Sequence, residues 1–305
     1  MDREASPPGK PPSTGEGSPL FSVIVSAYGR PQYLSQALGS VASQTIGDFE
    51  CIVVDDASPE PLAAPADARF RIIRRETNGG PAAARNTGVG AARGTYVTFL
   101  DDDDVYTPRK LELGLRGMSR APIAVCWSAS LDGGRPSGRT LEGDVSDSIL
   151  EGIVPHVGTT TVRRDLILSF DESLRAGDDI EWWLRLAQVA PVTTVPEVGY
   201  LFRYHQAPRH GRAAAVRLAG GLDVLRRHAD YFADHPKAAA FRWFRIGQHV
   251  GRVGDNRLAR RAFLRSFRSR PSARTAWYAL RSLRPSRASL ERREPPPGAE
   301  GGSGR

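Results

Sequence analysis

Four aspartates in a row occupy positions 101–104, directly after the apolar stretch TYVTFL at 95–100. Neighbouring carboxylates repel one another, so a chain that keeps four of them at the end of a buried strand needs something to offset the repulsion. Clustered hard oxygen ligands suit Mg²⁺ or Mn²⁺, which need only one or two carboxylates when the phosphates of a substrate complete their shell. The run therefore predicts a divalent-metal site. A solvated acidic turn is the alternative, because a helix N-cap explains only one aspartate.

The chain around this run alternates between two kinds of segment. From Leu20 onward, short apolar stretches typical of strands are separated by segments whose apolar residues recur at helical spacing. The expected strands are 21–26, 50–54, 71–74 and 95–100, and the expected helices are 33–44 and 81–92. This alternation predicts an α/β fold in which helices flank a mostly parallel sheet.

A set of polar residues follows each expected strand. The four sets are 27–30, 55–58, 78–80 and 101–104. Ligands of such sheets bind beyond the carboxyl ends of the strands, so we expect the four sets to meet in one cleft. They would supply it with carboxylates, an exposed aromatic ring, glycine-rich backbone and a helix N-terminus.

Three blocks of this sequence resemble the successive motifs of family 2 glycosyltransferases. Within residues 20–207 they read SVIVSAYGRPQYLSQALGSVASQTIGDFECIVVDDAS, NGGPAAARNTGVGAARGTYVTFLDDDD and AGDDIEWWLRLA, in the order and spacing of the family. The resemblance implies the GT-A fold, a Rossmann-like mixed and mostly parallel sheet. It also implies metal-dependent, inverting transfer of a sugar from a nucleoside diphosphate sugar to a glycan or lipid-linked acceptor, with Mn²⁺ or Mg²⁺.

The resemblance assigns residues to the donor. Those expected to bind the nucleotide sugar are Ser26, Tyr28, Asp55, Asp56, Gly80, Arg85, Asp101, Asp102 and Arg203. Asp56 would recognise the nucleoside and Tyr28 would stack on the base, although Gly29 stands where the family usually has Asn. Arg85, in the ARN element behind a helix N-terminus, suits phosphate charge, with a structural ion pair to a nearby aspartate as the alternative.

The aspartate run matches the Asp-x-Asp element that holds the metal and the ribose in the family. We favour Asp103 as the direct metal ligand, with Asp101 and His205 as further ligands. Asp101 or Asp102 would then hold the ribose or a metal-bound water. His205 and Arg203 belong to YLFRYHQ, which resembles the closing element of the family.

The block GDDIEWWLRL resembles the element that carries the catalytic base, with Asp178 in place of the usual Glu. Inverting transfer requires the acceptor hydroxyl to lose its proton as it attacks, and we expect Asp179 to take it. An N-cap role for Asp179 is the alternative. Trp182 and Trp183 are adjacent and face different ways on a helix, so we expect one to pack inward and the other to stack on an acceptor sugar.

Charge divides the chain into two regions. Residues 1–208 contain 20 Lys and Arg against 27 Asp and Glu, whereas residues 209–305 contain 22 against 7. We expect a GT-A domain at 20–208 and a basic helical region at 209–286. A solvated helical cap, a surface that contacts anionic membrane and a nucleic-acid face are the three interpretations of that region, in this order. No nucleic-acid partner is expected.

The remaining features concern the tails of the chain and the cellular compartment in which we expect the protein. Residues 1–19 and 287–305 are rich in Pro, Gly and Ser, which predicts disordered tails. No run reaches the roughly 18 apolar residues of a membrane span. The N-terminus also lacks an apolar signal core, so we expect a cytoplasmic protein with peripheral contact at the inner face of the membrane. Cys51 and Cys126 lie in apolar stretches and are predicted to be reduced core residues.

Two other functions fit less well. A nucleotidyltransferase-like enzyme would carry a Gly-rich, Lys-containing loop after the first strand, and Gly-Arg-Pro at 29–31 does not resemble one. A catalytically decayed nucleotide-sugar-binding module is favoured by Asp178 and Gly29, which depart from the family pattern. The retained aspartate run and Asp179 argue against decay.

Overall fold

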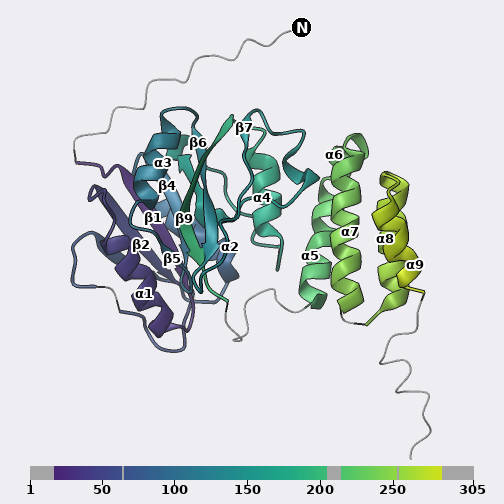
Figure 1. Cartoon of the computed structure of the whole chain (residues 1–305). Coiled ribbons are helices and arrows are strands. Elements are labelled where there is room, and N and C mark those ends of the chain that lie inside the picture. Colours follow the sequence, from purple (N-terminus) through teal and green to yellow (C-terminus); the bar gives the residue numbers. More distant parts are fainter. Residues whose placement is uncertain (1–16, 64, 205–213, 253, 284–305) are drawn as a thin grey trace, which may run out of the picture. The chain divides into compact units, whose positions relative to one another are not determined.

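The computed structural model describes residues 17–63, 65–204, 214–252 and 254–283 (Figure 1). The chain divides into two compact units, Met1–His210 and Gly211–Arg305. His205 and nearly all of the two predicted tails lie outside the described residues. Among the described residues, no helix has the length and apolar character needed to cross a membrane.

The first unit is built on a mixed sheet. Its strands are β1 (Phe21–Ala27), β2 (Phe49–Asp55), β3 (Phe70–Arg74), β4 (Tyr96–Asp101), β5 (Val105–Tyr106), β6 (Ile123–Ser130), β7 (Glu142–Gly143), β8 (Thr160–Arg163) and β9 (Val192–Phe202). They lie in the order β3-β2-β1-β4-β8-β6-β9-β5, with β7 beside β9. β1 runs parallel to both β2 and β4, and β6 to β9, whereas β8 is antiparallel to its neighbours β4 and β6. The predicted α/β fold is confirmed.

Helices flank this sheet (Figure 1). They are α1 (Pro31–Ala42), α2 (Gly80–Ala91), α3 (Lys110–Met118) and α4 (Asp178–Leu186), with short 3₁₀ turns η1 (Ile149–Glu151), η2 (Val157–Thr159) and η3 (Arg164–Leu166). The apolar stripe expected on the first helix is confirmed, because it buries Leu34, Ala37, Leu38 and Val41. All seven residues of β2 are buried, as a strand covered on both faces requires. Both cysteines are buried and free.

The strand register aligns the ends of the central strands. Ala27 at the end of β1 lies opposite Asp55 at the end of β2, and Ser26 lies opposite Asp101 at the end of β4. The polar residues that follow these three strands therefore emerge at one edge of the sheet. The prediction of a shared edge is confirmed for them.

The second unit is helical. Its elements are α5 (Ala214–Arg227), α6 (Ala229–Asp234), α7 (Pro236–Arg252), α8 (Asn256–Ser269) and α9 (Ala273–Arg281). Three rings form the contact between α7, α8 and α9, since Phe244 and Phe263 lie 5.6 Å apart and Tyr278 lies 5.0 and 5.3 Å from them. Asp255 caps α8 by accepting a hydrogen bond from the backbone N–H of Leu258 at 2.8 Å.

Candidate active site

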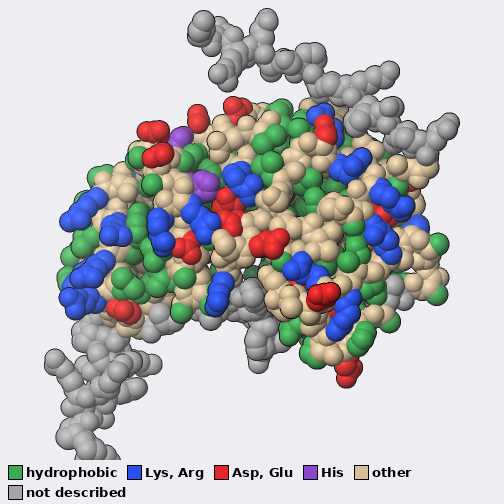
Figure 2. Space-filling view, turned by 180° about the vertical axis from the view of Figure 1, so that it is seen from behind, with side chains coloured by type: hydrophobic (Ala, Val, Ile, Leu, Met, Phe, Trp, Pro, Cys, Tyr) green, Lys and Arg blue, Asp and Glu red, His purple; other side chains and the backbone are tan. Residues whose placement is uncertain are grey.

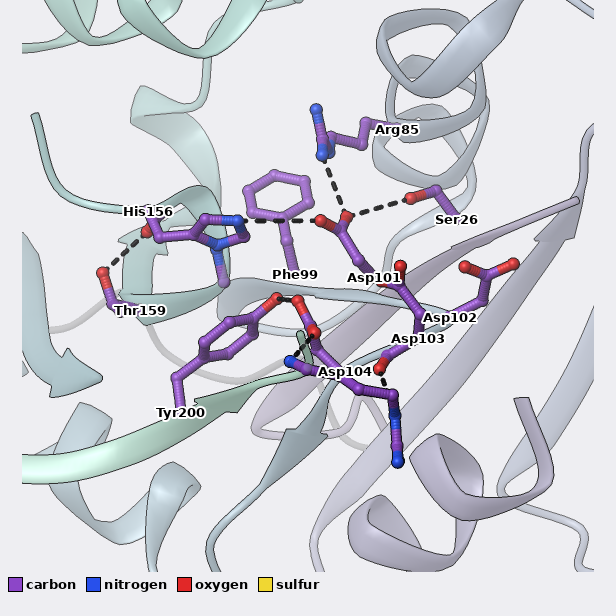
Figure 3. Close-up of polar contacts among 12 residues, drawn as sticks. Ser26, Arg85, Phe99, Asp101, Asp102, Asp103, Asp104, His156, Thr159 and Tyr200 are labelled. Carbon is purple, nitrogen blue, oxygen red and sulfur yellow. Dashed lines mark hydrogen bonds and ion pairs between the residues drawn. The ribbon is translucent and has the colours of Figure 1, made fainter. Parts of the chain in front are cut away.

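Asp101, the last residue of β4, is the centre of the polar cluster in Figure 3. Its Oδ1 accepts hydrogen bonds from Arg85 Nη2 at 2.9 Å and from Ser26 Oγ at 3.4 Å. Its Oδ2 lies 3.8 Å from Nε2 of His156. Burial by itself would raise the pKa of Asp101, but the charges of Arg85 and His156 outweigh it and lower the pKa to about 2. The carboxylate is therefore ionised at neutral pH.

Arg85 joins the end of β4 to the start of α4. It is buried on α2, and its Nη1 donates to Oδ2 of Asp178 at 2.9 Å while Nη2 donates to Asp101. Burial opposes the charge of Arg85, but the two aspartates hold its pKa above the ordinary value. Burial and the neighbouring Asp179 raise the pKa of Asp178 despite this pair. The alternative of a structural ion pair is thus realised in the structure, and contact with phosphate stays a prediction.

Asp179, the expected base, lies in the first turn of α4 and is partly exposed. The N-cap position belongs to Gly177, whose φ of 82° is left-handed and favours glycine. Asp179 is therefore not the N-cap of this helix, and its Oδ1 accepts a hydrogen bond from the backbone N–H of Ile180 at 2.8 Å. Its role in catalysis stays a prediction.

Arg30 pairs with the next two carboxylates of the run. Its Nη2 lies 2.7 Å from Oδ1 of Asp102, and its Nη1 lies 2.5 Å from Oδ2 of Asp103. Asp102 also accepts a hydrogen bond from the backbone N–H of Tyr28 at 2.9 Å, which links the loop after β1 to the run. Burial raises the pKa of Asp102 to about 7, because it outweighs the opposite effect of Arg30. An arginine thus offsets part of the repulsion that the sequence implies.

Asp104 points away from Arg30 and toward β9. Tyr200 Oη donates to its Oδ2 at 2.6 Å, and the backbone N–H of Arg203 donates to its Oδ1 at 2.7 Å. Burial, together with the charges of Asp101 and Asp103, raises the pKa of Asp104 to about 6. Arg203 itself donates from Nε to the backbone oxygen of Asp103 at 3.1 Å, so this predicted donor-binding residue lies beside the run.

Three side chains offer ligand atoms for a metal ion. Among the described residues, one atom each from Asp101, Asp104 and His156 lie within 4.8 Å of one another. The His156 Nδ1 accepts a hydrogen bond from the backbone N–H of Gly158 at 3.2 Å, while its Nε2 faces Asp101. Its ring lies 4.8 Å from that of Tyr200. Carboxylates are ligands of both Mn²⁺ and Mg²⁺, whereas an imidazole is a softer donor that suits a transition metal, so the set fits Mn²⁺ better than Mg²⁺.

This ligand set differs from the one that the sequence suggests. Asp103 does not join it, because its carboxylate pairs with Arg30, and His205 lies outside the described residues. Asp104 and His156 were not predicted as ligands. With four consecutive aspartates, the Asp-x-Asp pattern does not show which two of them are the metal ligands. His156 lies 52 residues beyond Asp104 in a stretch without a recognisable motif.

The two aspartates after β2 also hold the backbone in place. Asp56 accepts hydrogen bonds from the backbone N–H groups of Gly79 at 3.0 Å and Gly80 at 2.7 Å, which fixes the start of α2. Asp55 pairs with Arg74 and accepts from the backbone N–H of Ser58 at 2.9 Å. Their recognition of a nucleoside stays a prediction. Tyr28 is 46% exposed beside them, as a base-stacking ring must be.

The two tryptophans of α4 require a correction. Neither Trp182 nor Trp183 has any exposed surface. Trp182 stacks on Phe170 with ring centroids 4.8 Å apart and meets Phe99 of β4 edge-on at 5.9 Å. The prediction that one of them is open to an acceptor sugar is wrong, because β4 and η1 both contact α4 and leave no indole in solvent.

Gly158 provides a test of this geometry. A Cβ at this position would lie 2.0 Å from Cε2 of Tyr200. Gly158→Ala should therefore displace the ring that donates to Asp104 and lower the free energy of unfolding by about 1–3 kcal/mol. Gly39→Ala is the control, since its Cβ would meet nothing within 4 Å. Thermal unfolding of both variants measures the effect, and equal midpoints would contradict the tight contact between Gly158 and Tyr200.

Comparisons with known proteins show which family the sequence resembles. The sequence model described as "Glycosyl transferase family 2" matches residues 22–144. The succinoglycan biosynthesis protein ExoW of Rhizobium meliloti is 42% identical over 123 residues, which are 37% of this chain and 38% of ExoW. The matches of this chain to the first three curated relatives span between 26% and 38% of their lengths.

Solved structures give the fold. S. aureus TarS 1–349 in complex with UDP-GlcNAc has a TM-score of 0.60 at 19% identity, over 86% of this chain and 88% of that chain. The mannosyltransferase PcManGT from Pyrobaculum calidifontis, in complex with GDP-Man and Mn²⁺, has a TM-score of 0.55 at 16% identity, over 87% of this chain and 80% of that chain. The GT-A fold is shared with these structures. Residues 22–144 of this chain are therefore similar to glycosyl transferase family 2.

Proposed function

We propose that this protein transfers a sugar, with inversion, from a nucleoside diphosphate sugar to a hydroxyl of a glycan or lipid-linked acceptor. The observation that carries the proposal is the bridge from Asp101 through Arg85 to Asp178, because Asp178 is the neighbour of the predicted base Asp179 on α4. The complexes of TarS with UDP-GlcNAc and of PcManGT with GDP-Man support a donor of this class.

A divalent cation, Mn²⁺ or Mg²⁺, would be held by Asp101, Asp104 and His156. When bound, it supplies positive charge that stabilises the diphosphate leaving group. The Mn²⁺ in the PcManGT complex supports the use of a divalent metal. Arg30 already offsets part of the charge of Asp102 and Asp103, and the ligands proposed for the cation include the two outer carboxylates of the run.

The residues of this chain carry the other parts of the reaction. The exposed ring of Tyr28 stacks on the base of the donor. The acceptor oxygen forms a bond to the anomeric carbon as the bond from that carbon to the diphosphate oxygen breaks, and the diphosphate leaves with the electron pair. Asp179 takes the proton of the acceptor hydroxyl. Arg85 holds Asp178, and with it the first turn of α4, at a fixed distance from Asp101.

A panel of nucleoside diphosphate sugars, each with Mn²⁺ or Mg²⁺, tests the donor and the metal. We expect one donor to raise the thermal unfolding midpoint and to be hydrolysed slowly, only with the metal present. Asp101→Asn and His156→Ala should each weaken metal-dependent donor binding on the order of 10- to 100-fold.

Asp165→Asn is the matched control, since Asp165 pairs with Arg163 outside the cluster and should bind donor normally. Donor binding that is equally strong in all variants and independent of metal would contradict the metal site. Metal-dependent binding without hydrolysis or transfer to any acceptor would instead indicate a nucleotide-sugar-binding module.

A further inference from the structure

The second unit contains an apolar hollow that the proposed reaction does not use. Helices α5, α7 and α8 enclose about 450 Å³. We call this hollow the groove. Its lining residues are Leu218, Leu222, Trp243, Ile246, Leu258, Arg261, Ala262, Leu264, Arg265 and Arg268. Seven of the ten are apolar, and none is acidic. Leu258 and Leu264 are 38% and 41% exposed, so apolar side chains also form part of the outer surface.

The charged part of the groove comes from one helix. Arg261, Arg265 and Arg268 lie four and three residues apart on α8, a spacing that puts them on one face. The guanidinium of Arg265 lies 4.6 Å from the centre of the Trp243 ring, so a positive charge lies directly against the apolar wall. The groove thus combines an apolar interior with a border of cations.

The rest of the unit does not neutralise this charge. Residues 214–283 contain fifteen Lys and Arg against four Asp, and blue side chains are prominent in Figure 2. Burial and the neighbouring charges of Arg217 and Arg252 lower the pKa of both Arg245 and His249, the latter to about 4. Acidic side chains close enough to raise those two pKa values are absent from the described residues. An anionic ligand would offset part of the net positive charge of the unit.

Several occupants fit the groove poorly. Of the residues outside the described ranges, 284–305 contain one large aliphatic side chain, Leu290, together with five arginines, and 205–213 contain none. These segments therefore offer too little apolar surface. A second copy of the unit would bring the same excess of positive charge. Nucleic acid supplies phosphates but no aliphatic chain for seven apolar lining residues.

We propose that the groove binds an anionic phospholipid, with an acyl chain in the hollow and the phosphate at Arg261, Arg265 and Arg268. This ligand matches both properties of the groove, because burial of the chain is favourable and the phosphate pairs with the guanidinium groups. The second unit thereby attaches the protein to membranes that contain anionic lipid. The proposal is independent of the transfer reaction.

Vesicle binding by the full chain tests the charged border. We expect sedimentation with mixed phosphatidylcholine–phosphatidylglycerol vesicles and not with pure phosphatidylcholine. The variant R261Q/R265Q/R268Q should bind on the order of 100-fold more weakly, since each arginine near the surface contributes to the attraction. R260Q/R270Q/R281Q removes the same charge from positions outside the groove, and its affinity for the vesicles should fall by less than about tenfold. Equal losses in the two triple variants would overturn a defined phosphate site.

Quenching of tryptophan fluorescence tests the position of the acyl chain of the lipid. Phosphatidylglycerol with brominated acyl chains should quench the protein, and Trp243→Phe should remove most of that quenching. Trp277→Phe is the control, because Trp277 is 52% exposed and does not line the groove. Quenching that survives in Trp243→Phe would overturn the proposal. Displacement of the vesicles by a single-stranded RNA oligonucleotide at low concentration would overturn it in favour of nucleic-acid binding.

Discussion

An Asp179→Asn variant is expected to bind donor normally and to transfer sugar about 10²- to 10⁴-fold more slowly than the wild type. Asn has the shape of Asp but cannot accept the proton of the acceptor hydroxyl at neutral pH. Asp179 is not the N-cap of α4, and Asp178 rather than Asp179 makes the ion pair with Arg85. The substitution should therefore leave the fold and the donor site intact.

The loss should be confined to kcat, measured with saturating donor and acceptor. Glu181→Gln is the control on the same helix, since Glu181 pairs with Arg185 at 2.7 Å and is buried. A large loss of kcat in Glu181→Gln with full activity in Asp179→Asn would move the base to Glu181. Loss of donor binding in Asp179→Asn would mean that the residue positions the donor and does not act as a base.

Arg85→Met is expected to lower the free energy of unfolding by about 3–5 kcal/mol. The side chain is buried and donates one hydrogen bond to each of two carboxylates, Asp101 and Asp178, at 2.9 Å. Its removal leaves two negative charges in a cluster that already contains Asp179. Methionine preserves most of the volume, so the loss reports on charge and not on a cavity.

Urea unfolding gives the magnitude, with Arg93→Met as the control. Arg93 also pairs with a buried carboxylate, Glu50 at 3.3 Å, but its side chain is 67% exposed, and the expected loss is below about 1 kcal/mol. The double variant Arg85→Met/Asp178→Asn should lose less than Arg85→Met alone, because one unpaired charge is removed. If the double variant loses more, the bridge is not the source of the stability.

Local patterns in the sequence predict the sheet and the edge at which the site lies. Strands and helices have different periods, so apolar spacing separates β1 from α1 and correctly selects Leu34, Leu38 and their neighbours for the core. The parallel order of β1, β2 and β4 then places the residues after each strand together. No side-chain geometry is needed for that step.

The identity of each partner could not be predicted, because partners are set by packing across the sheet. Arg30 lies in the loop after β1, where no recognisable motif predicts an ion pair. It nevertheless pairs with both Asp102 and Asp103. Adjacent helical positions such as Trp182 and Trp183 differ in direction by about 100°. That difference predicts one exposed ring only when a single side of the helix is covered, and α4 is contacted by both β4 and η1.

The antiparallel direction of β8 has a consequence for specificity. Because β8 runs against β4, the residues that precede β8 arrive at the end of β4, and this brings His156 to Asp101. The chain between β7 and η2 contains no strand, but Ile149 and Leu150 of η1 are fully buried and η1 contacts α4. Substitutions at the exposed residues of this segment can reshape the surface beside His156 without changing any strand pairing. One reversed strand thus brings a segment without strand pairing of its own to the edge of the sheet where the candidate site lies.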